Sequence, residues 1–159
     1  MTNFKGKRIL ITGASRGVGF EASKLFLKAG AHVIGTGRDE TRLKATTATL
    51  QQLGDFTSLL ADFDDAQAPA AVAQAVRAQW DSLDMLLNNA AVQTYKENWM
   101  EEGLQLLNDQ WRCNVFAQHE LIFRLQDLLK AGSEPRIINV SSGAGSLQAL
   151  KESPDMPTY

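Results

Sequence analysis

The sequence predicts an α/β fold in which a doubly wound parallel sheet lies between two layers of helices. Short apolar runs alternate five times with longer segments of helical periodicity. Parallel strands need long crossover connections, which helices usually supply, so this order favours a parallel sheet covered on both faces. At 159 residues the chain has room for one ordinary domain. We therefore expect residues 1–159 to form a single three-layer α/β/α domain.

Five apolar runs predict the strands of this sheet. Each is short and is bounded by residues that favour turns, as is typical of buried strands. The runs are residues 8–12, 31–36, 56–60, 83–87 and 136–140.

The segments between these runs predict helices. In the first, over residues 18–29, apolar residues recur at helical spacing and Gly30 supplies a stop signal. Further helices are expected at about residues 40–52 and 64–80, and a long, bent one at 104–129. The candidate core residues of this long helix are Leu107, Trp111, Val115, Leu121, Ile122, Leu125 and Leu129.

Composition and charge exclude several classes of protein. The chain is 44% hydrophobic and 21% charged, which fits a globular protein. Its net charge of −2 is too balanced to indicate a nucleic-acid partner. A single cysteine, Cys113, excludes an intramolecular disulfide, and no Cys/His cluster has the spacing of a metal site. With no apolar leader and no run long enough to span a bilayer, we expect a cytoplasmic protein with no membrane partner.

The first strand is followed by the pattern Thr12-Gly13-x-x-x-Gly17-x-Gly19. Glycines in such a turn let the backbone bend sharply, and they let a pyrophosphate approach the amides at the start of the next helix. The pattern is not the commoner Gly-x-Gly-x-x-Gly. Its position between a strand and a helix nevertheless favours a nucleotide site over a glycine-rich connection without a ligand.

The second strand ends in Gly35-Thr36-Gly37-Arg38-Asp39. An NAD site usually places an acidic side chain at the end of this strand, where it holds the ribose 2′-hydroxyl. Arg38 instead offers a guanidinium fork suited to a phosphate, and Arg16 in the glycine turn lies on the same side. We therefore predict NADP(H) as the cofactor. Asp39 is interpreted as the cap of the following helix, with ribose binding as the less favoured alternative.

With these motifs the chain resembles the short-chain dehydrogenase/reductase family in its compact single-domain form. The resemblance covers nearly the whole chain. Beyond the glycine turn it rests on Asp62, Asn88-Asn89-Ala90, Asn114 and Ile138-Asn139-Val140-Ser141-Ser142. The segment from Ser141 to Lys151 looks like the carbonyl-reductase-like branch.

The resemblance implies a Rossmann-like fold and assigns roles to residues of the cofactor site. Asp62 is expected to bond the adenine amino group beside the main chain of Phe63, and Asn89 and Ala90 to line the path to the nicotinamide. Asn88 is expected to brace the sheet. The full set of expected cofactor-binding residues is Gly13, Ser15, Arg16, Gly17, Val18, Gly19, Arg38, Asp62, Phe63, Asn89, Ala90 and Ala91.

The resemblance also implies a catalytic set. Ser142, with Ser141 as the less favoured alternative, matches the serine that holds the substrate carbonyl. Tyr159 matches the acid–base tyrosine, and Asn114 matches the asparagine that holds a water in the proton relay. A non-catalytic alternative stays open for each of these residues. The serines could cap a strand end, the Asn114 amide could be satisfied by backbone groups, and the terminal tyrosine could be inert.

The sequence departs from the family pattern at its C-terminal end. The lysine expected four residues after the tyrosine lies beyond Tyr159, and the interval from Ser142 to Tyr159 is longer than usual. We therefore expect the cofactor-binding part of a longer chain, with the C-terminal part of the fold missing.

The implied activity is that of an NADP(H)-dependent oxidoreductase, which reduces a carbonyl compound or oxidises a secondary alcohol by hydride transfer. Its expected partners are a small-molecule substrate and, when the chain is complete, further copies in a dimer or tetramer. The alternatives are a nucleotide-binding fragment or NADP(H) sensor without turnover, and a structural or interaction protein.

Overall fold

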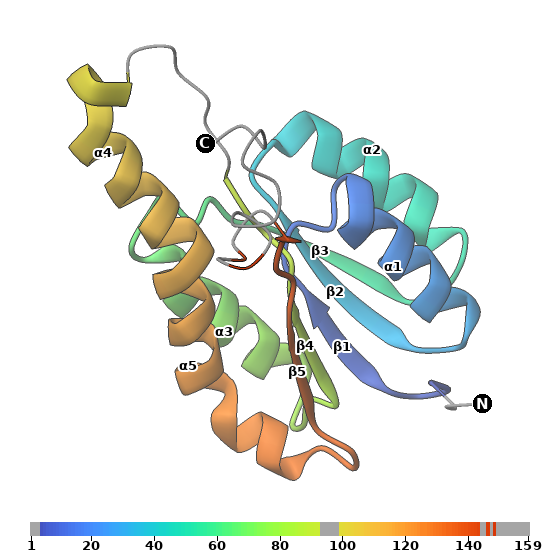
Figure 1. Ribbon diagram of the computed structural model, residues 1–159. Coiled ribbons are helices and arrows are strands. Elements are labelled where there is room, and N and C mark those ends of the chain that lie inside the picture. Colours follow the sequence, from blue (N-terminus) through green and yellow to red (C-terminus); the bar gives the residue numbers. More distant parts are fainter. Residues whose placement is uncertain (1–3, 93–98, 144–145, 147, 149–159) are drawn as a thin grey trace.

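The computed structural model describes residues 4–92, 99–143, 146 and 148, and only the backbone of 99–102. A five-stranded sheet runs through the centre of the molecule, with helices on both of its faces (Figure 1). The strands are β1 (Arg8–Ile11), β2 (His32–Gly37), β3 (Phe56–Leu60), β4 (Met85–Asn88) and β5 (Arg136–Asn139).

All neighbouring strands are parallel, and their order is β3-β2-β1-β4-β5. The chain starts at the centre, moves outward to β3, and then returns to place β4 on the other side of β1. This reversal makes the sheet doubly wound, as predicted, and it creates a crevice at the carboxyl ends of β1 and β4 where ligands bind in such folds.

Two helical layers cover the sheet. The helices are α1 (Gly17–Lys28), α2 (Glu40–Gln51), α3 (Ala68–Gln79), α4 (Trp99–Trp111), the π-helical turn η1 (Arg112–Phe116) and α5 (Ala117–Ala131). Residues that alternate along the central strands face opposite layers, because successive side chains of a strand point to opposite faces. Ile9 and Ile11 pack with Leu27 of α1 and Leu50 of α2.

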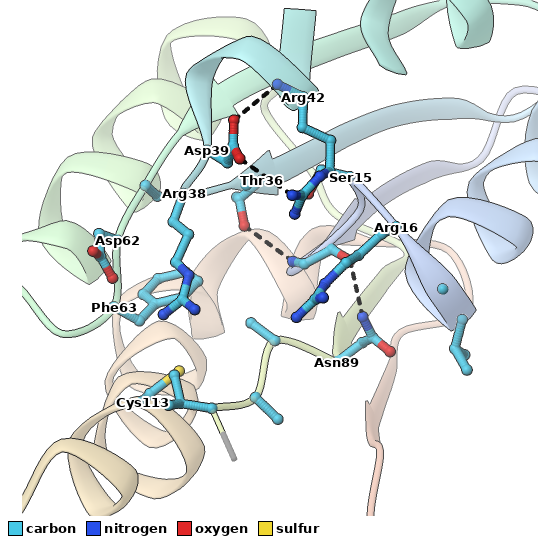
Figure 2. A pocket seen from close by; sticks show the side chains of 18 residues that line it. Ser15, Arg16, Thr36, Arg38, Asp39, Arg42, Asp62, Phe63, Asn89 and Cys113 are labelled. Carbon is cyan, nitrogen blue, oxygen red and sulfur yellow. Dashed lines mark hydrogen bonds and ion pairs between the residues drawn. The ribbon is translucent and has the colours of Figure 1, made fainter. Parts of the chain in front are cut away.

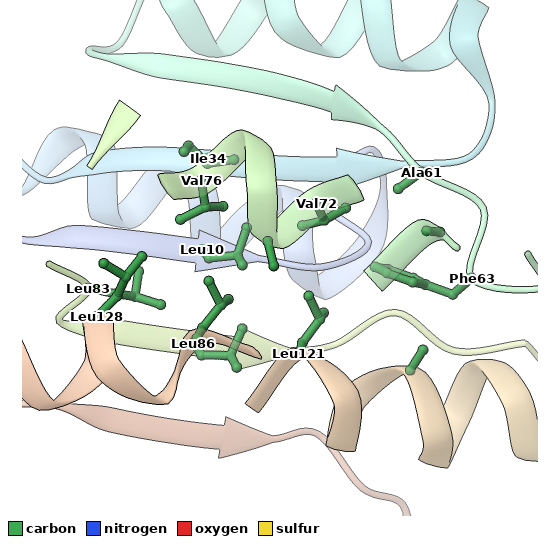
Figure 3. Packing of buried hydrophobic residues seen from close by; sticks show 14 of the residues in the cluster. Leu10, Ile34, Ala61, Phe63, Val72, Val76, Leu83, Leu86, Leu121 and Leu128 are labelled. Atoms are coloured by element: carbon green, nitrogen blue, oxygen red, sulfur yellow. The ribbon is translucent and has the colours of Figure 1, made fainter. Parts of the chain in front are cut away.

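Leu10 of β1 faces the other layer. It belongs to a second cluster with Leu86 of β4, Val76 of α3 and Leu121 of α5 (Figure 3). These side chains are almost completely buried. The two clusters confirm the predicted three-layer α/β/α architecture.

The predicted helix over 64–80 begins later than expected. Side chains of the preceding aspartates hold local turns: Asp62 Oδ1 accepts from the Asp64 amide at 3.2 Å, and Asp65 Oδ1 accepts from the Gln67 amide at 2.9 Å. Such bonds offer the backbone an alternative to the helix. The helix α3 therefore starts at Ala68, with Pro69 in its first turn.

The prediction for the core face of the long helix was wrong in its first half. Leu107, Trp111 and Val115 are 51%, 53% and 43% exposed, whereas Cys113 is 5% exposed. The π-helical turn η1 explains the difference, because its extra residue rotates everything before it by about 100° relative to α5. In α5 the predicted core residues Leu121, Leu125 and Leu129 are buried.

Asn88 braces the sheet as expected, since its Nδ2 donates to Asn139 Oδ1 at 2.8 Å between β4 and β5. Within the described residues, no helix is long and apolar enough to cross a membrane.

Candidate functional site

A cavity of about 630 Å³ lies at the carboxyl ends of the central strands, a size in the usual range for ligand pockets. It includes eleven of the twelve residues expected to bind cofactor, and Figure 2 shows their arrangement. The residues that line it are Gly13, Ser15, Arg16, Gly17, Val18, Thr36, Gly37, Arg38, Asp39, Arg42, Ala61, Asp62, Phe63, Asn89, Ala90, Ala91, Val92 and Cys113.

The twelfth expected residue, Gly19, lies buried beneath the glycine turn. A Cβ at this position would meet the Gly13 carbonyl oxygen at 2.3 Å, so only glycine lets α1 pack this closely on the turn. Gly13 itself has a φ of 69°, in the left-handed region that glycine favours. Both glycines are thus required by the shape of the turn.

The N-terminus of α1 is suited to binding an anion. No side chain caps the helix at Arg16, and its first turn contains no acidic residue. A Cβ built at Gly17 would meet no atom of another described segment within 4 Å, so the described chain leaves this part of the turn open. Uncapped amides and the positive end of the helix dipole together favour a phosphate here. The residues present therefore fit the diphosphate of a dinucleotide.

Thr12 and Asn89 hold the glycine turn against the end of β4. Thr12 Oγ1 accepts hydrogen bonds from the amides of Asn89 and Ala90, both at 2.9 Å. Asn89 Nδ2 donates to the carbonyl oxygens of Thr12 and Gly13 at 3.0 and 3.1 Å. Asn89 thus braces the turn as well as lining the cavity. Thr12 belongs to the predicted motif, but its role in holding the turn was not predicted, although a threonine at the end of a buried strand is a usable signal.

Three arginines line the cavity. Arg16 and Arg38 were predicted, and Arg42 in the first turn of α2 was missed. Asp39 caps α2 as predicted: its Oδ1 accepts from the Arg42 amide at 2.9 Å. Its Oδ2 lies 3.3 Å from Arg42 Nη2. The carboxylate at the end of β2 is therefore already engaged with its own helix.

Arg38 extends toward a group of acidic residues on the other side of the cavity. Its Nη1 lies 3.9 Å from Asp64 Oδ2. Burial, together with the charges of Asp62 and Asp109, raises the pKa of Asp64 above its ordinary value. Phe63, only 5% exposed, lies beside Arg38 in the close view (Figure 2). This end offers carboxylates beside a buried aromatic residue, which suit the amino group of an adenine.

Cys113 lies on the floor of the cavity, where burial raises the pKa of its thiol to about 11. It is a buried apolar residue and not a reactive thiolate at neutral pH. Within the described residues, no group of histidine, cysteine, aspartate and glutamate side chains has the arrangement of a metal site.

The three catalytic candidates differ in how they lie relative to the cavity. Asn114 lies in η1 beside the cavity, with its side chain bonded to the main chain of Val92. Ser142 is exposed and follows β5 at the same edge of the sheet, where the Val140 amide still donates to the Asn88 carbonyl. Tyr159 lies outside the described residues.

Comparison with known proteins identifies the family of this chain. A family model described as short chain dehydrogenase matches residues 7–157, almost the entire chain. This protein belongs to the short-chain dehydrogenase family. The match confirms the resemblance seen in the motifs, and the doubly wound sheet with a glycine turn after β1 agrees with it.

The short-chain dehydrogenase is also similar to individual proteins of known name. It is 33% identical to a fatty acyl-CoA reductase of Acinetobacter baylyi over 144 residues, covering 88% of this chain and 48% of the relative. It is 30% identical to (+)-neomenthol dehydrogenase of Arabidopsis thaliana, covering 87% of this chain and 54% of the relative. The chain thus spans about half the length of these two relatives.

Solved structures agree with the fold. A metagenomic short-chain oxidoreductase in complex with NADP has a TM-score of 0.82 and 29% identity, covering 91% of this chain and 65% of that one. L-sorbose reductase of Gluconobacter frateurii, complexed with NADPH and L-sorbose, has a TM-score of 0.84 and 26% identity, covering 94% of this chain and 57% of that one.

Proposed function

We propose that this short-chain dehydrogenase binds NADP(H) and belongs to an enzyme that reduces a carbonyl compound or oxidises a secondary alcohol. The observation that carries the proposal is the positive charge that lines the cavity around the end of β2. Three arginines line the cavity, and the carboxylate at the end of β2, Asp39, is engaged in capping α2. An NAD site would need a carboxylate free to hold the ribose hydroxyls. NADP and NADPH complexes among the solved relatives support the choice of cofactor.

In this proposal residues 1–159 form one NADP-binding domain, and different parts of the cavity bind different groups of the cofactor. The amides at Gly17 and Val18 receive the diphosphate, while Arg16 and Arg38 hold the 2′-phosphate. Asp62 and the Phe63 main chain receive the adenine, and Ala90 and Ala91 line the route toward the nicotinamide. When bound, the nicotinamide ring supplies or accepts the hydride.

The remaining chemistry is proton transfer, for which we propose roles for Ser142, Tyr159 and Asn114. Ser142 is proposed to hold the substrate oxygen and Tyr159 to exchange its proton. A tyrosine with an ordinary pKa near 10 is a weak base at neutral pH, so this role requires a nearby cation. Asn114 positions the loop after β4 through Val92, and the amide's second lone pair and second N–H are left to hold a relay water.

We also propose that the intact protein is a homo-oligomer. Apolar side chains of α4 and η1 support this: Leu104, Trp111 and Phe116 are 81%, 53% and 61% exposed. Surface of this kind is typical of a face that another helix covers. Light scattering during gel filtration of the full-length protein tests the point. A monomer at micromolar concentration would contradict it.

Thermal unfolding with added nucleotide tests the proposed function directly. A ligand bound only by the folded state raises the midpoint, and at equal concentration the tighter ligand raises it further, so NADP⁺ is expected to raise it more than NAD⁺. No shift with either nucleotide would contradict the proposal and favour a structural protein.

A second assay separates an enzyme from a binding module. NADPH absorbance is followed in the presence of a generic aldehyde or diketone. NADPH binding with substrate-dependent consumption supports the oxidoreductase. Binding without consumption by the full-length protein would favour the alternative, a nucleotide sensor.

A further inference from the structure

Arg42 is a third cation of the cavity that the family motifs do not point to. It lies in the first turn of α2 and lines the cavity with Arg16 and Arg38. Its side chain is 48% exposed, so the guanidinium is accessible to a ligand.

The helix α2 and the end of β2 pack directly on the glycine turn. Thr46 Oγ1 donates to the Ser15 carbonyl oxygen at 3.1 Å, and a Cβ at Gly37 would meet Ser15 at 3.1 Å. Figure 2 shows the Arg42 side chain reaching from α2 toward Ser15 and Arg16, whereas Arg38 extends toward Phe63. Arg42 and Arg38 therefore approach the cavity from different sides.

The present partner of Arg42 is easily exchanged. Asp39 Oδ2 lies 3.3 Å from Arg42 Nη2, and the two side chains are 42% and 48% exposed. An exposed ion pair of this kind contributes little stability, because water screens it. Asp39 Oδ1 also accepts the Arg42 amide, and this capping bond does not depend on the guanidinium. Arg42 can leave Asp39 without uncapping α2.

We infer that Arg42 is a specificity-determining residue for the 2′-phosphate of the cofactor, and that Asp39 competes with that phosphate for it. This inference rests on the proposed NADP(H) function. A phosphate monoester carries more charge than a carboxylate and has three acceptor oxygens, so it offers Arg42 a stronger, bidentate partner. The guanidinium moves from Asp39 to the phosphate, which Arg16 approaches from the glycine turn.

Calorimetric titration with adenosine 2′,5′-bisphosphate and with 5′-AMP tests the inference without turnover. The two probes differ only in the 2′-phosphate. In Arg42→Gln, the affinity for the bisphosphate is expected to fall about tenfold, as for the loss of one charged hydrogen-bonded pair, with little change for 5′-AMP.

The matched control is Lys44→Gln. Lys44 lies on the same helix, pairs with Glu40 at 2.7 Å and is 76% exposed, so its loss changes the net charge equally. The control is expected to leave both affinities within about twofold. If Arg42→Gln weakens both probes equally, or no more than Lys44→Gln does, the inference is overturned.

Asp39→Asn tests the competition. Asparagine caps helices as well as aspartate does, so α2 stays intact while Arg42 loses its charged partner. Bisphosphate affinity is expected to rise by a few fold, and by more than in Glu40→Gln, which removes an equal charge from the next residue. An unchanged or lower affinity would overturn the role of Asp39.

The wild-type titration separates this inference from the proposed function. If the wild-type protein does not prefer the bisphosphate to 5′-AMP, the NADP(H) proposal fails, and the inference fails with it. If the preference exists and Arg42→Gln retains it, only the inference fails.

Discussion

The side chain of Asn114 is bonded at both ends to the main chain of one residue, Val92. Asn114 Nδ2 donates to the Val92 carbonyl oxygen at 2.9 Å, and Asn114 Oδ1 accepts from the Val92 amide at 2.8 Å. This pair ties the π-helical turn η1 to the loop that leaves β4 along the cavity. The position of that loop, and with it the wall of the cavity, depends on a residue for which the family resemblance implies a place in a proton relay.

Replacing Asn114 with alanine is therefore expected to destabilise the fold as well as the site. Both groups of Val92 would lose their partner, at a cost of about 1–3 kcal/mol for each poorly solvated group. Urea unfolding at neutral pH measures the loss. Gln118→Ala is the control, because among the described residues Gln118 donates a single bond, to the Ala90 carbonyl at 3.3 Å. Equal losses in the two variants would contradict the bracing role of Asn114.

Gly19→Ala is expected to abolish nucleotide binding. The new Cβ would lie 2.3 Å from the Gly13 carbonyl oxygen, so the glycine turn must move away from α1. The amides that receive the diphosphate move with it. Equilibrium dialysis against NADPH measures the effect.

The control for this variant is Gly103→Ala, where a Cβ meets no atom within 4 Å. Alanine in the interior of α4 is expected to stabilise that helix by about 0.5–1 kcal/mol and to leave binding unchanged. Normal NADPH affinity in Gly19→Ala would show that the close approach of helix and turn is not needed.

Asp84 is expected to govern stability at low pH. Burial alone would raise its pKa, but hydrogen bonds from the Arg8 amide and from Ser133, with the charge of Lys7, hold the pKa below its ordinary value of 3.8. The folded state thus favours the ionised form. The resulting stability is present above the unfolded pKa and is lost as pH falls through the lower folded pKa.

Urea unfolding of Asp84→Asn at about pH 7 and at about pH 3 measures this contribution. The variant is expected to be less stable than the wild type at neutral pH, and the difference is expected to shrink in acid. Asp81→Asn is the control, because Asp81 is 87% exposed and its pair with Arg8 adds little. A difference that stays constant with pH would contradict the assignment.

The single thiol, Cys113, is expected to react slowly in the folded protein. Its pKa of about 11 leaves very little thiolate at neutral pH, and its side chain is almost completely buried. The rate of reaction with a disulfide reagent is measured in buffer and in concentrated urea, where the thiol regains an ordinary pKa. A native rate close to the unfolded rate would show that the cavity floor is open.

The parallel, doubly wound sheet and the cofactor-binding edge could be predicted from the sequence for a clear reason. Apolar runs that alternate with helical segments indicate strands buried on both faces of a sheet. The glycine turn and Arg38 follow the ends of two such strands, and a parallel sheet places these ends at the same edge. The buried face of the long helix could not be predicted from the sequence. Leu107 and Leu121 would share a face in an ideal α-helix, but the extra residue of η1 separates them. The local composition does not indicate where a π-helical turn forms.

Arg42 was missed for a related reason. An arginine in the first turn of a helix most often forms an exposed pair with a capping aspartate, as Arg42 does with Asp39. Its place in the cavity depends on how α2 packs against Ser15. That packing is a tertiary contact between segments far apart in the sequence, so a motif does not reveal it.

The central claim is that arginines at the α2 side of the cavity select a cofactor with a 2′-phosphate. Fluorescence titration with NADPH and with NADH, in the wild type and in Arg38→Gln, tests it most directly. We expect the wild type to bind NADPH at least about tenfold more tightly, and Arg38→Gln to lose most of that preference while its NADH affinity is unchanged. Equal affinities for the two cofactors in the wild type would contradict the account.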